Sequence, residues 1–435
     1  MFREPDDSIL VGLCVGTSKI AVIVAERDPR SSEMVHVIGI SSAQSQGIRK
    51  GLIVNLEQAE QSVRNAVKDA ENIVGFRLDQ AMVSFNALDV MSLKTEGMIS
   101  LGRTSRPVQV DDVERVIEAA QSQLSIPPNK LPLHTIPVRY SLDGNFGIDD
   151  PMGMAGMRLD IELQTVTVPM PYVHNVVNCV EASGLEVEGL VIKPLASALG
   201  ALTDEEMRVG AISLSIGGGT TGLTFYRDGC PVKVSIIPIG GDHITSDLAN
   251  VLRLPLNKAE NFKKRLFSMD SSEFITLTSR GQQARTIDPN TACEVIRYRL
   301  EELFADYVAA LIPERDPRLF PAGIILSGGV AKTPGIEMLL SDIFRMPVRL
   351  ADPWEHCQLP PGREDPSYVN ALGTVHYILD RERSPYRFID PPRLQWHPEH
   401  IRHLVPRGKK REQPKLGQRV QNMMDRVKES FKELF

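Results

Sequence analysis

The sequence has few cysteines, no excess of basic residues and no long hydrophobic run. Its five cysteines are scattered and form no C-x-x-C pair. We therefore expect free thiols in a reducing compartment, with neither a zinc site nor a disulfide framework. The formal net charge is -6, whereas general affinity for nucleic acid needs a basic surface. We expect no nucleic-acid partner.

A membrane-spanning helix needs roughly 20 consecutive apolar residues, and no window of the sequence approaches this. The first seven residues are acidic and precede no signal-like apolar stretch, so we expect no secretory signal. We expect a protein that can lie on a membrane without crossing it. The chain has 435 residues, which exceeds one ordinary core and favours two or more domains.

Glycine-threonine loops follow apolar strands in two places. Apolar runs within Ser8–Glu26 flank Gly16-Thr17-Ser18-Lys19, which predicts a β-hairpin of buried strands. About 200 residues later, the run 209–215 enters Gly217-Gly218-Gly219-Thr220-Thr221 and leaves as the strand 223–226. This repetition indicates an internal duplication of a fold unit. A third apolar strand, 323–326, leads into Gly328-Gly329-Val330.

These loops are candidates for binding a nucleotide. Tight glycine turns expose backbone N–H groups where no side chain blocks a phosphate. Two facing loops can hold a triphosphate from both sides, and the third can approach the nucleoside. A single loop is more typical of an ordinary hairpin turn than of a nucleotide site, but three in this order favour a nucleotide site.

Hydrophobic periodicity predicts the other elements. We expect further strands at 35–40, 79–85 and 159–168, and helices at 56–74, 110–124, 172–183, 244–252, 258–267 and 292–311. Residues 86–169 read as a small inserted α/β subdomain. We interpret Met152, Met154 and Met157 as core residues and His134 as structural.

The last residues of the chain carry a regular apolar stripe. From Arg381 the sequence is rich in proline and charge, which is typical of a linker. Periodicity resumes at three- and four-residue steps, which predicts an amphipathic helix lying in an anionic lipid surface. Docking on the body of the protein or on a partner is the alternative. The stripe consists of Leu416, Val420, Met423, Met424, Val427, Phe431, Leu434 and Phe435.

The three glycine loops resemble the phosphate-1, phosphate-2 and adenosine motifs of the actin/Hsp70/sugar-kinase superfamily. More closely, the chain resembles the FtsA family of bacterial division proteins over nearly its whole length. His134–Pro137 and Asp150–Leu159 resemble segments of that family's inserted subdomain 1C. Residues 239–247 resemble the helix start that follows the second phosphate loop.

The resemblance implies an α/β protein with an actin-like, duplicated ribonuclease-H-type fold. It has two large domains, an inserted subdomain 1C and a C-terminal amphipathic helix. The implied ranges are 1–85 for the first part of subdomain 1A, 86–169 for 1C, 170–204 for the return to 1A, 205–380 for domain 2 with 2B inserted at about 250–315 and a closing return toward 1A, 381–414 for the linker, and 415–435 for the membrane-targeting helix.

The resemblance also implies functional residues beyond the loops. Gly241 belongs to the segment that resembles the helix start after the second phosphate loop, and the resemblance includes it among the nucleotide-binding residues. Glu260 and Lys263 match positions near the ribose and adenine of ATP, although an exposed polar helix face would also explain them. Arg299 and Glu302 match positions implicated in receiving the C-terminal tail of FtsZ. Arg299 could bind a carboxylate of that acidic tail through two parallel hydrogen bonds.

Three departures from the family pattern concern Mg²⁺. Relatives carry carboxylates where this chain has Cys14, Ser215 and Gly222. Carboxylates at such places hold Mg²⁺ and its waters, and a cysteine thiol is a poor Mg²⁺ ligand. We expect ATP binding with weak or absent hydrolysis, no complete Mg²⁺ site and no catalytic residue.

The resemblance thus implies a peripheral membrane adaptor at the division site, on the cytoplasmic face of the bacterial inner membrane. Its implied partners are the FtsZ tail, an anionic lipid surface, later divisome proteins and further copies of itself in an actin-like protofilament. A pilus-assembly adaptor of the PilM type and an ATP-dependent kinase of the same superfamily are the alternatives.

Overall fold

The computed structural model describes most of the chain up to Ile389. The described residues are 8–28, 34–268, 275–277, 285–287, 289–313, 316–352, 357–359, 365–384 and 387–389. Residues 415–435, predicted as the amphipathic helix, lie outside this set, as does most of the predicted linker 381–414.

The first sheet has six strands in the order β13-β6-β1-β2-β3-β21, of which the first half of the chain supplies all except β21. The predicted hairpin is confirmed, since β1 and β2 are antiparallel neighbours. β3 is antiparallel to β2, whereas β6 runs parallel to β1 and β13 parallel to β6. The strands are β1 Ile9–Val15, β2 Lys19–Arg27, β3 Val35–Gln44, β6 Gln80–Phe85, β13 Glu186–Ile192 and β21 Cys357–Gln358.

The second half repeats this arrangement in a five-stranded sheet, in the order β16-β15-β14-β19-β20. As in the first sheet, the neighbours β16-β15 and β15-β14 are antiparallel, whereas β14-β19 and β19-β20 are parallel. Strands β3-β2-β1-β6-β13 therefore correspond to β16-β15-β14-β19-β20, as the repeated glycine-threonine loops predict. The strands are β14 Ala211–Ile216, β15 Thr221–Arg227, β16 Cys230–Ile237, β19 Gly323–Ser327 and β20 Val348–Leu350.

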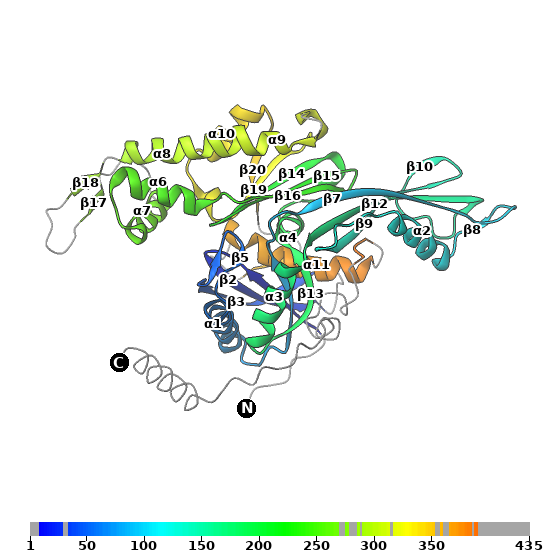
Figure 1. The fold of residues 1–435 in the computed structure, drawn as a ribbon, viewed down its shortest axis with the longest axis horizontal. Helices are drawn as coiled ribbons and strands as arrows, with labels where there is room; N and C mark the ends of the chain where they lie inside the picture. Colours follow the sequence, from blue (N-terminus) through cyan, green and yellow to red (C-terminus); the bar gives the residue numbers. More distant parts are fainter. Residues whose placement is uncertain are drawn as a thin grey trace, which may run out of the picture. The chain divides into compact units, whose positions relative to one another are not determined.

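Two helices lie between the two sheets, as Figure 1 shows. The helix α11 (Val369–Arg383) packs on β1, and α4 (Lys193–Leu199) packs on β14 and β15. The two helices cross closely, because a Cβ added to Gly373 would lie 1.7 Å from the carbonyl oxygen of Ala196. Only a glycine therefore fits at this crossing.

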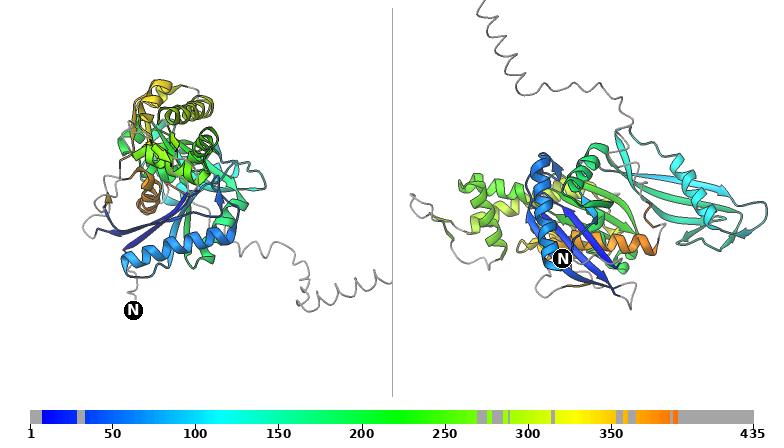
Figure 2. Two further views of the ribbon diagram at one scale, coloured as in Figure 1. Left: turned by 90° about the vertical axis from the view of Figure 1, so that its left-hand side faces the viewer. Right: turned by 90° about the horizontal axis from the view of Figure 1, so that it is seen from below.

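Helix α1 (Leu56–Val74) covers the opposite face of the first sheet, together with α3 (Met170–Ala182) (Figure 2). The predicted range of α1 is confirmed, and its ends explain why. The side chain of Asn55 accepts a hydrogen bond from the N–H of Gln58, and Gly75 ends the helix with φ of 80°.

The inserted block 86–169 is a four-stranded antiparallel sheet covered by one helix (Figure 1). Its helix α2 (Val110–Ser122) packs on β7 and β12 and encloses a separate hydrophobic core. The sheet order is β10-β9-β12-β7, with β7 Met91–Ser100, β9 Lys130–Leu142, β10 Asn145–Ile148 and β12 Arg158–Pro169, and a small pair joins β8 Arg106–Pro107 to β11 Ala155–Gly156.

A buried histidine ties this block to the first sheet. His134 on β9 is fully buried. Its Nε2 accepts a hydrogen bond from the N–H of Ile192 at 3.1 Å, and its Nδ1 lies 3.1 Å from the hydroxyl of Tyr377. The structural interpretation of His134 is confirmed. The core interpretation of Met152, Met154 and Met157 is wrong, since these side chains are 38%, 42% and 48% exposed.

The second sheet carries its own layer of helices and core. The predicted helix 292–311 divides into an α-helix, a π-helical stretch and a short α-helical end. The helices are α5 Asp204–Val209, α6 Gly241–Leu252, α7 Leu256–Ser268, α8 Pro289–Glu302, the π-helical residues Leu303–Val308, α9 Ala309–Leu311 and α10 Ile336–Phe344. A short strand pair, β17 Ile275–Leu277 and β18 Arg285–Ile287, lies between α7 and α8 in the sequence. A second short pair, β4 Ile48–Arg49 and β5 Leu52–Ile53, belongs to the first half of the chain.

The body extends into the segment predicted as a linker. Arg381 pairs with Glu188 at 2.9 Å. Phe388 is 2% exposed, and its ring centroid lies 5.0 Å from that of Tyr377. Ile389 exchanges two backbone hydrogen bonds with Thr135. Apolar burial therefore holds the chain on the body beyond α11. Among the described residues, no helix is both long and apolar enough to cross a membrane.

We expect Phe388→Ala to lower the free energy of unfolding by about 3–5 kcal/mol, because it leaves a cavity against Tyr377. Phe146→Ala is the matched control, since Phe146 is 78% exposed, and it should change stability by less than about 0.5 kcal/mol. Urea denaturation followed by circular dichroism measures both. Equal stability of the two variants would show that residues 387–389 do not belong to the folded body.

Candidate functional site

A cavity of about 470 Å³ is lined by residues from both halves of the chain. Its walls come from segments that directly follow the carboxyl ends of parallel strands. Gly16 to Ser18 follow β1, Asn86 follows β6, and Lys193 follows β13. Gly217 to Thr220 follow β14, and Gly328 to Val330 follow shortly after β19. Open α/β sheets bind ligands at this edge.

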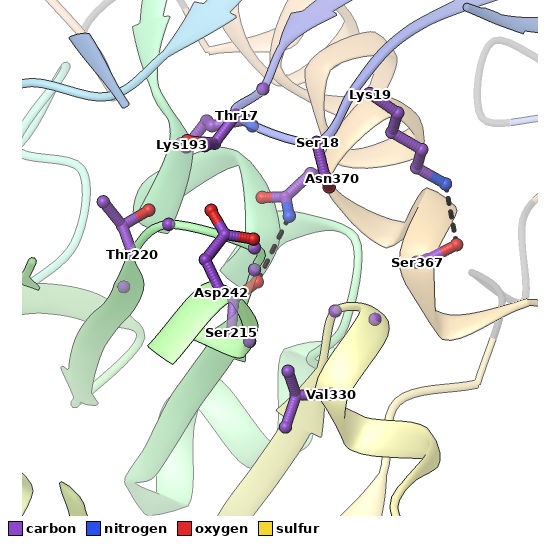
Figure 3. A pocket seen from close by; sticks show the side chains of 18 of the residues that line it. Thr17, Ser18, Lys19, Lys193, Ser215, Thr220, Asp242, Val330, Ser367 and Asn370 are labelled. Atoms are coloured by element: carbon purple, nitrogen blue, oxygen red, sulfur yellow. Dashed lines mark hydrogen bonds between the residues drawn. The ribbon is translucent and has the colours of Figure 1, made fainter. Parts of the chain in front are cut away.

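The two glycine-threonine loops face each other across this cavity (Figure 3). A Cβ added to Gly218 would lie 3.0 Å from the Cβ of Ser18, and one added to Gly219 would lie 2.7 Å from Thr17 Oγ1. Any side chain at Gly219 would force the loops apart. The glycines therefore allow the backbones of the two loops to approach each other.

Polar contacts fix the loops in this arrangement. Thr17 Oγ1 accepts a hydrogen bond from the N–H of Gly51 at 2.9 Å. Asn86 Nδ2 donates to Thr220 Oγ1 at 2.8 Å, which joins the first half to the second. Thr221, predicted as a site residue, does not line the cavity. It is buried, and its hydroxyl donates to the carbonyl oxygen of Ile239 at 2.8 Å.

The helix α6 begins directly at the second loop. The N–H of Gly241 donates to the carbonyl oxygen of Gly217 at 2.9 Å, and the N–H of Asp242 donates to that of Gly218 at 2.7 Å. Asp242 lines the cavity in the first turn of α6. Burial raises the pKa of its carboxyl, which the Lys263 ammonium partly counteracts.

On α7, the buried Lys263 forms an ion pair with the half-buried Glu260 beside the start of α6. Lys263 Nζ donates to the carbonyl oxygen of Gly241 at 2.9 Å and to Thr245 Oγ1 at 2.7 Å, and it lies 2.7 Å from Glu260 Oε2. Burial raises the pKa of Glu260, but Lys263 and the Thr245 hydroxyl outweigh this and leave it below its usual value. Both residues line the cavity, as predicted, and they also stabilise its wall.

Lysines outnumber acids around the cavity. The lining includes five lysines, but Asp242 and Glu260 are its acidic residues. An excess of ammonium groups beside exposed backbone N–H groups suits a polyanion such as a triphosphate. The lysines are Lys19, Lys193, Lys263, Lys264 and Lys332.

Lys19 is the most perturbed of these cations. Its ammonium donates to Ser367 Oγ at 2.7 Å and lies 3.6 Å from the ring centroid of Tyr368. Burial lowers its pKa to about 8; Cys14 and Asp365 counteract the shift, and Lys332 and Lys193 add to it. A bound anion would relieve this repulsion.

The positions that lack the expected carboxylates lie in the cavity wall. Cys14, Ser215 and Gly222 all line it. Ser215 Oγ accepts a hydrogen bond from Asn370 Nδ2 at 3.2 Å. A Cβ added to Gly222 would lie 2.8 Å from Pro194 Cγ, so a side chain there needs a shift of its surroundings. Mg²⁺ prefers carboxylate and other oxygen ligands in octahedral geometry. This set of residues does not fit a resident Mg²⁺.

Comparison with known proteins identifies the family. The family model "Cell division protein FtsA" matches residues 212–373, and "SHS2 domain inserted in FTSA" matches residues 89–167, within the predicted inserted block. The cell division protein FtsA of Pseudomonas aeruginosa is 34% identical over 380 residues, which cover 86% of this chain and 90% of that protein. The chain belongs to the FtsA family. FtsA of Bacillus subtilis is 32% identical over 87% of this chain and 85% of its own length.

Solved structures show the fold. A chain of a PilM-PilN type IV pilus biogenesis complex superposes with a TM-score of 0.61 at 19% identity, covering 86% of this chain and 99% of its own. MreB5 of Spiroplasma citri, bound to ADP, superposes with a TM-score of 0.50 at 15% identity, over 87% of this chain and 99% of its own. The predicted actin-like fold is confirmed.

Arg299 and Glu302, the predicted partner-binding residues, lie on α8, away from the cavity lining. Arg299 already makes two parallel hydrogen bonds to Asp247, at 2.6 and 2.9 Å, and a third to Glu302 at 2.5 Å. These carboxylates raise the pKa of the guanidinium, Asp247 most. Its planar fork is therefore engaged within the chain, so an acidic peptide would have to compete with Asp247.

The ion pair between Lys263 and Glu260 on α7 allows a matched test of its contribution to stability. We expect Lys263→Met to lower the free energy of unfolding by about 2 kcal/mol, because Glu260 loses its buried partner. Lys264 also approaches Glu260, at 3.4 Å, but its side chain is 70% exposed. Lys264→Met should therefore cost less than about 0.5 kcal/mol. Urea titration of both variants measures the difference, and similar losses would contradict this account of the cavity wall.

Proposed function

We propose that the chain is an actin-like adaptor of bacterial cell division that binds ATP in this cavity, with weak or absent hydrolysis. One observation carries the nucleotide part of the proposal: the glycine loops of the two duplicated sheets meet face to face at a lysine-rich cavity. Membership of the FtsA family supports the role in division.

The nucleotide would connect the two halves of the chain. The first loop belongs to the first sheet, and the second and third loops belong to the second sheet. A triphosphate held by backbone N–H groups of both loops would therefore favour a closed arrangement of the halves. ATP would thus bias the shape on which polymerisation into an actin-like protofilament depends.

The adaptor part of the proposal concerns the membrane and FtsZ. Residues 415–435 would lie in the anionic lipid surface of the inner membrane, on its cytoplasmic face, through the stripe from Leu416 to Phe435. The acidic tail of FtsZ would bind at Arg299 and Glu302 by exchanging with Asp247 on the guanidinium. Later divisome proteins would then gather on the tethered filament.

The lowered pKa of Lys19 predicts how ATP affinity depends on pH. The protonated ammonium binds a triphosphate better, so binding raises the pKa of Lys19 above its free value of about 8. Between these two pKa values, the affinity should fall with rising pH, by at most about tenfold per pH unit. Calorimetric titration with ATP from pH 7 to pH 9 measures this.

Lys19→Gln is the control for this pH dependence. It should bind ATP more weakly than the wild type at pH 7 and show a flatter profile up to pH 9. An equally steep profile in this variant would assign the titration to another group, and absence of ATP binding by the wild type would overturn the nucleotide part of the proposal.

FtsZ recruitment to anionic vesicles tests the two adaptor steps separately. We expect the full chain to sediment with phosphatidylglycerol-containing vesicles and to carry FtsZ with it. A chain that ends at Pro406 should stay in the supernatant, because it lacks the apolar stripe. Arg299→Ala should sediment but carry several-fold less FtsZ.

Arg297→Ala is the matched control on the same helix, since Arg297 is exposed and pairs with Glu301 at 3.6 Å. It should recruit FtsZ as the wild type does. Equal sedimentation of the full and shortened chains would refute the membrane step. Absence of FtsZ from the pellet of the full chain would refute the capture step.

A further inference from the structure

One lysine of the cavity has no counter-ion. Lys193 follows β13 directly and opens α4, and its side chain is partly buried. A methyl group on Gly16 would lie 3.0 Å from its Nζ, which places the ammonium against the first glycine loop. Figure 3 shows Lys193 beside Thr17, at the side of the cavity formed by the first half.

The other lysines of the cavity all have partners. Lys19 donates to Ser367, Lys332 pairs with Asp365, and Lys263 and Lys264 share Glu260. Within the described part of the chain, Lys193 makes neither a hydrogen bond nor an ion pair. Its half-buried ammonium lines the cavity beside the first glycine loop, so its positive charge is available to an anionic ligand there.

The surroundings of Lys193 are poor in groups that could hold a divalent cation. The lining positions Cys14, Ser215 and Gly222 supply no carboxylate. Among the residues described, no group of three or more His, Cys, Asp or Glu side chains could hold a metal ion. Glu260 is already engaged by Lys263 and the Thr245 hydroxyl.

Asp242, in the first turn of α6, is the other carboxylate among the lining residues, and the remaining side-chain oxygen atoms of the cavity are neutral. Asn86 and Asn370 both line it, and their Oδ1 atoms are buried without a hydrogen-bond partner among the described residues. Such amide oxygens accept hydrogen bonds from water or a ligand, but they add no negative charge to attract Mg²⁺. The Lys193 ammonium repels a cation near the first loop.

We propose that this cavity binds its nucleoside triphosphate free of divalent cation, and that the Lys193 ammonium supplies at the first loop the positive charge that would otherwise come from a metal. The proposal rests on the nucleotide binding proposed above. The phosphates would take Lys193 as a counter-ion and the backbone N–H groups of both loops as donors. Metal-free ATP carries more negative charge than its Mg²⁺ complex, and the lysine excess favours it.

Calorimetric titration of the full chain with ATP, once in EDTA and once in excess Mg²⁺, tests this proposal. We expect the wild type to bind ATP at least as tightly in EDTA as in Mg²⁺. Lys193→Met should weaken binding in EDTA at least tenfold, whereas Lys193→Arg should retain most of it. Lys68→Met, on the exposed face of α1, should bind as the wild type does.

Lys193→Glu provides a test of opposite sign. A carboxylate at this position should abolish binding in EDTA and make the remaining affinity depend on Mg²⁺. Thermal unfolding of each variant verifies that it is folded.

The outcomes separate this proposal from the proposed function. Binding of ATP by the wild type only in Mg²⁺ would overturn the metal-free assignment and leave nucleotide binding intact. Wild-type affinity of Lys193→Met in EDTA would overturn the role of Lys193. Absence of ATP binding under both conditions would overturn this proposal together with the nucleotide part of the proposed function.

Discussion

The site depends on one steric constraint, the absence of side chains where the two glycine loops meet. A Cβ on Gly219 would lie 2.7 Å from Thr17 Oγ1, and a Cβ on Gly240 would lie 2.6 Å from the carbonyl oxygen of Gly217. Close approach lets the second loop accept the first N–H groups of α6. The glycines of the second loop and of the start of α6 therefore fix both the position of α6 and the distance between the two loops.

Duplication explains why these loops converge, but the two halves use the shared topology differently. In the first half, the strands β6 and β13 lead into Asn86 and Lys193, which place an amide and an ammonium at the cavity. In the second half, β19 leads into Gly328, whose φ of 93° and close approach to Ile216 leave no room for a side chain. After its parallel strands, the first half thus places polar side chains at the cavity, whereas the second half brings its backbone close to the cavity.

The sequence predicts best what local chemistry determines. The N-terminal cap at Asn55 and the left-handed glycine at Gly75 determine the two ends of α1. The glycine loops can be recognised from their composition alone. Asn86 and Lys193 are missed as site residues because single polar residues after strands carry little signal until the topology places them together. The strand β7 is missed because Gly97 alone of its ten residues is buried, which weakens the apolar alternation. Phe388 is missed because its partner Tyr377 lies on α11 and the surrounding composition resembles a linker.

Charge around the cavity links the proposed ligand to the shape of the molecule. Lys19 and Lys193 belong to the first half, whereas Lys263 and Lys332 belong to the second. Like charges on both sides of a cavity oppose its closure, and the lowered pKa of Lys19 reflects that repulsion in addition to burial. An anion between them removes the repulsion, so its binding energy favours the closed form without any hydrolytic step. Under the proposed function, such a cavity would respond to nucleotide although Cys14, Ser215 and Gly222 stand where carboxylates would help to hold a metal ion.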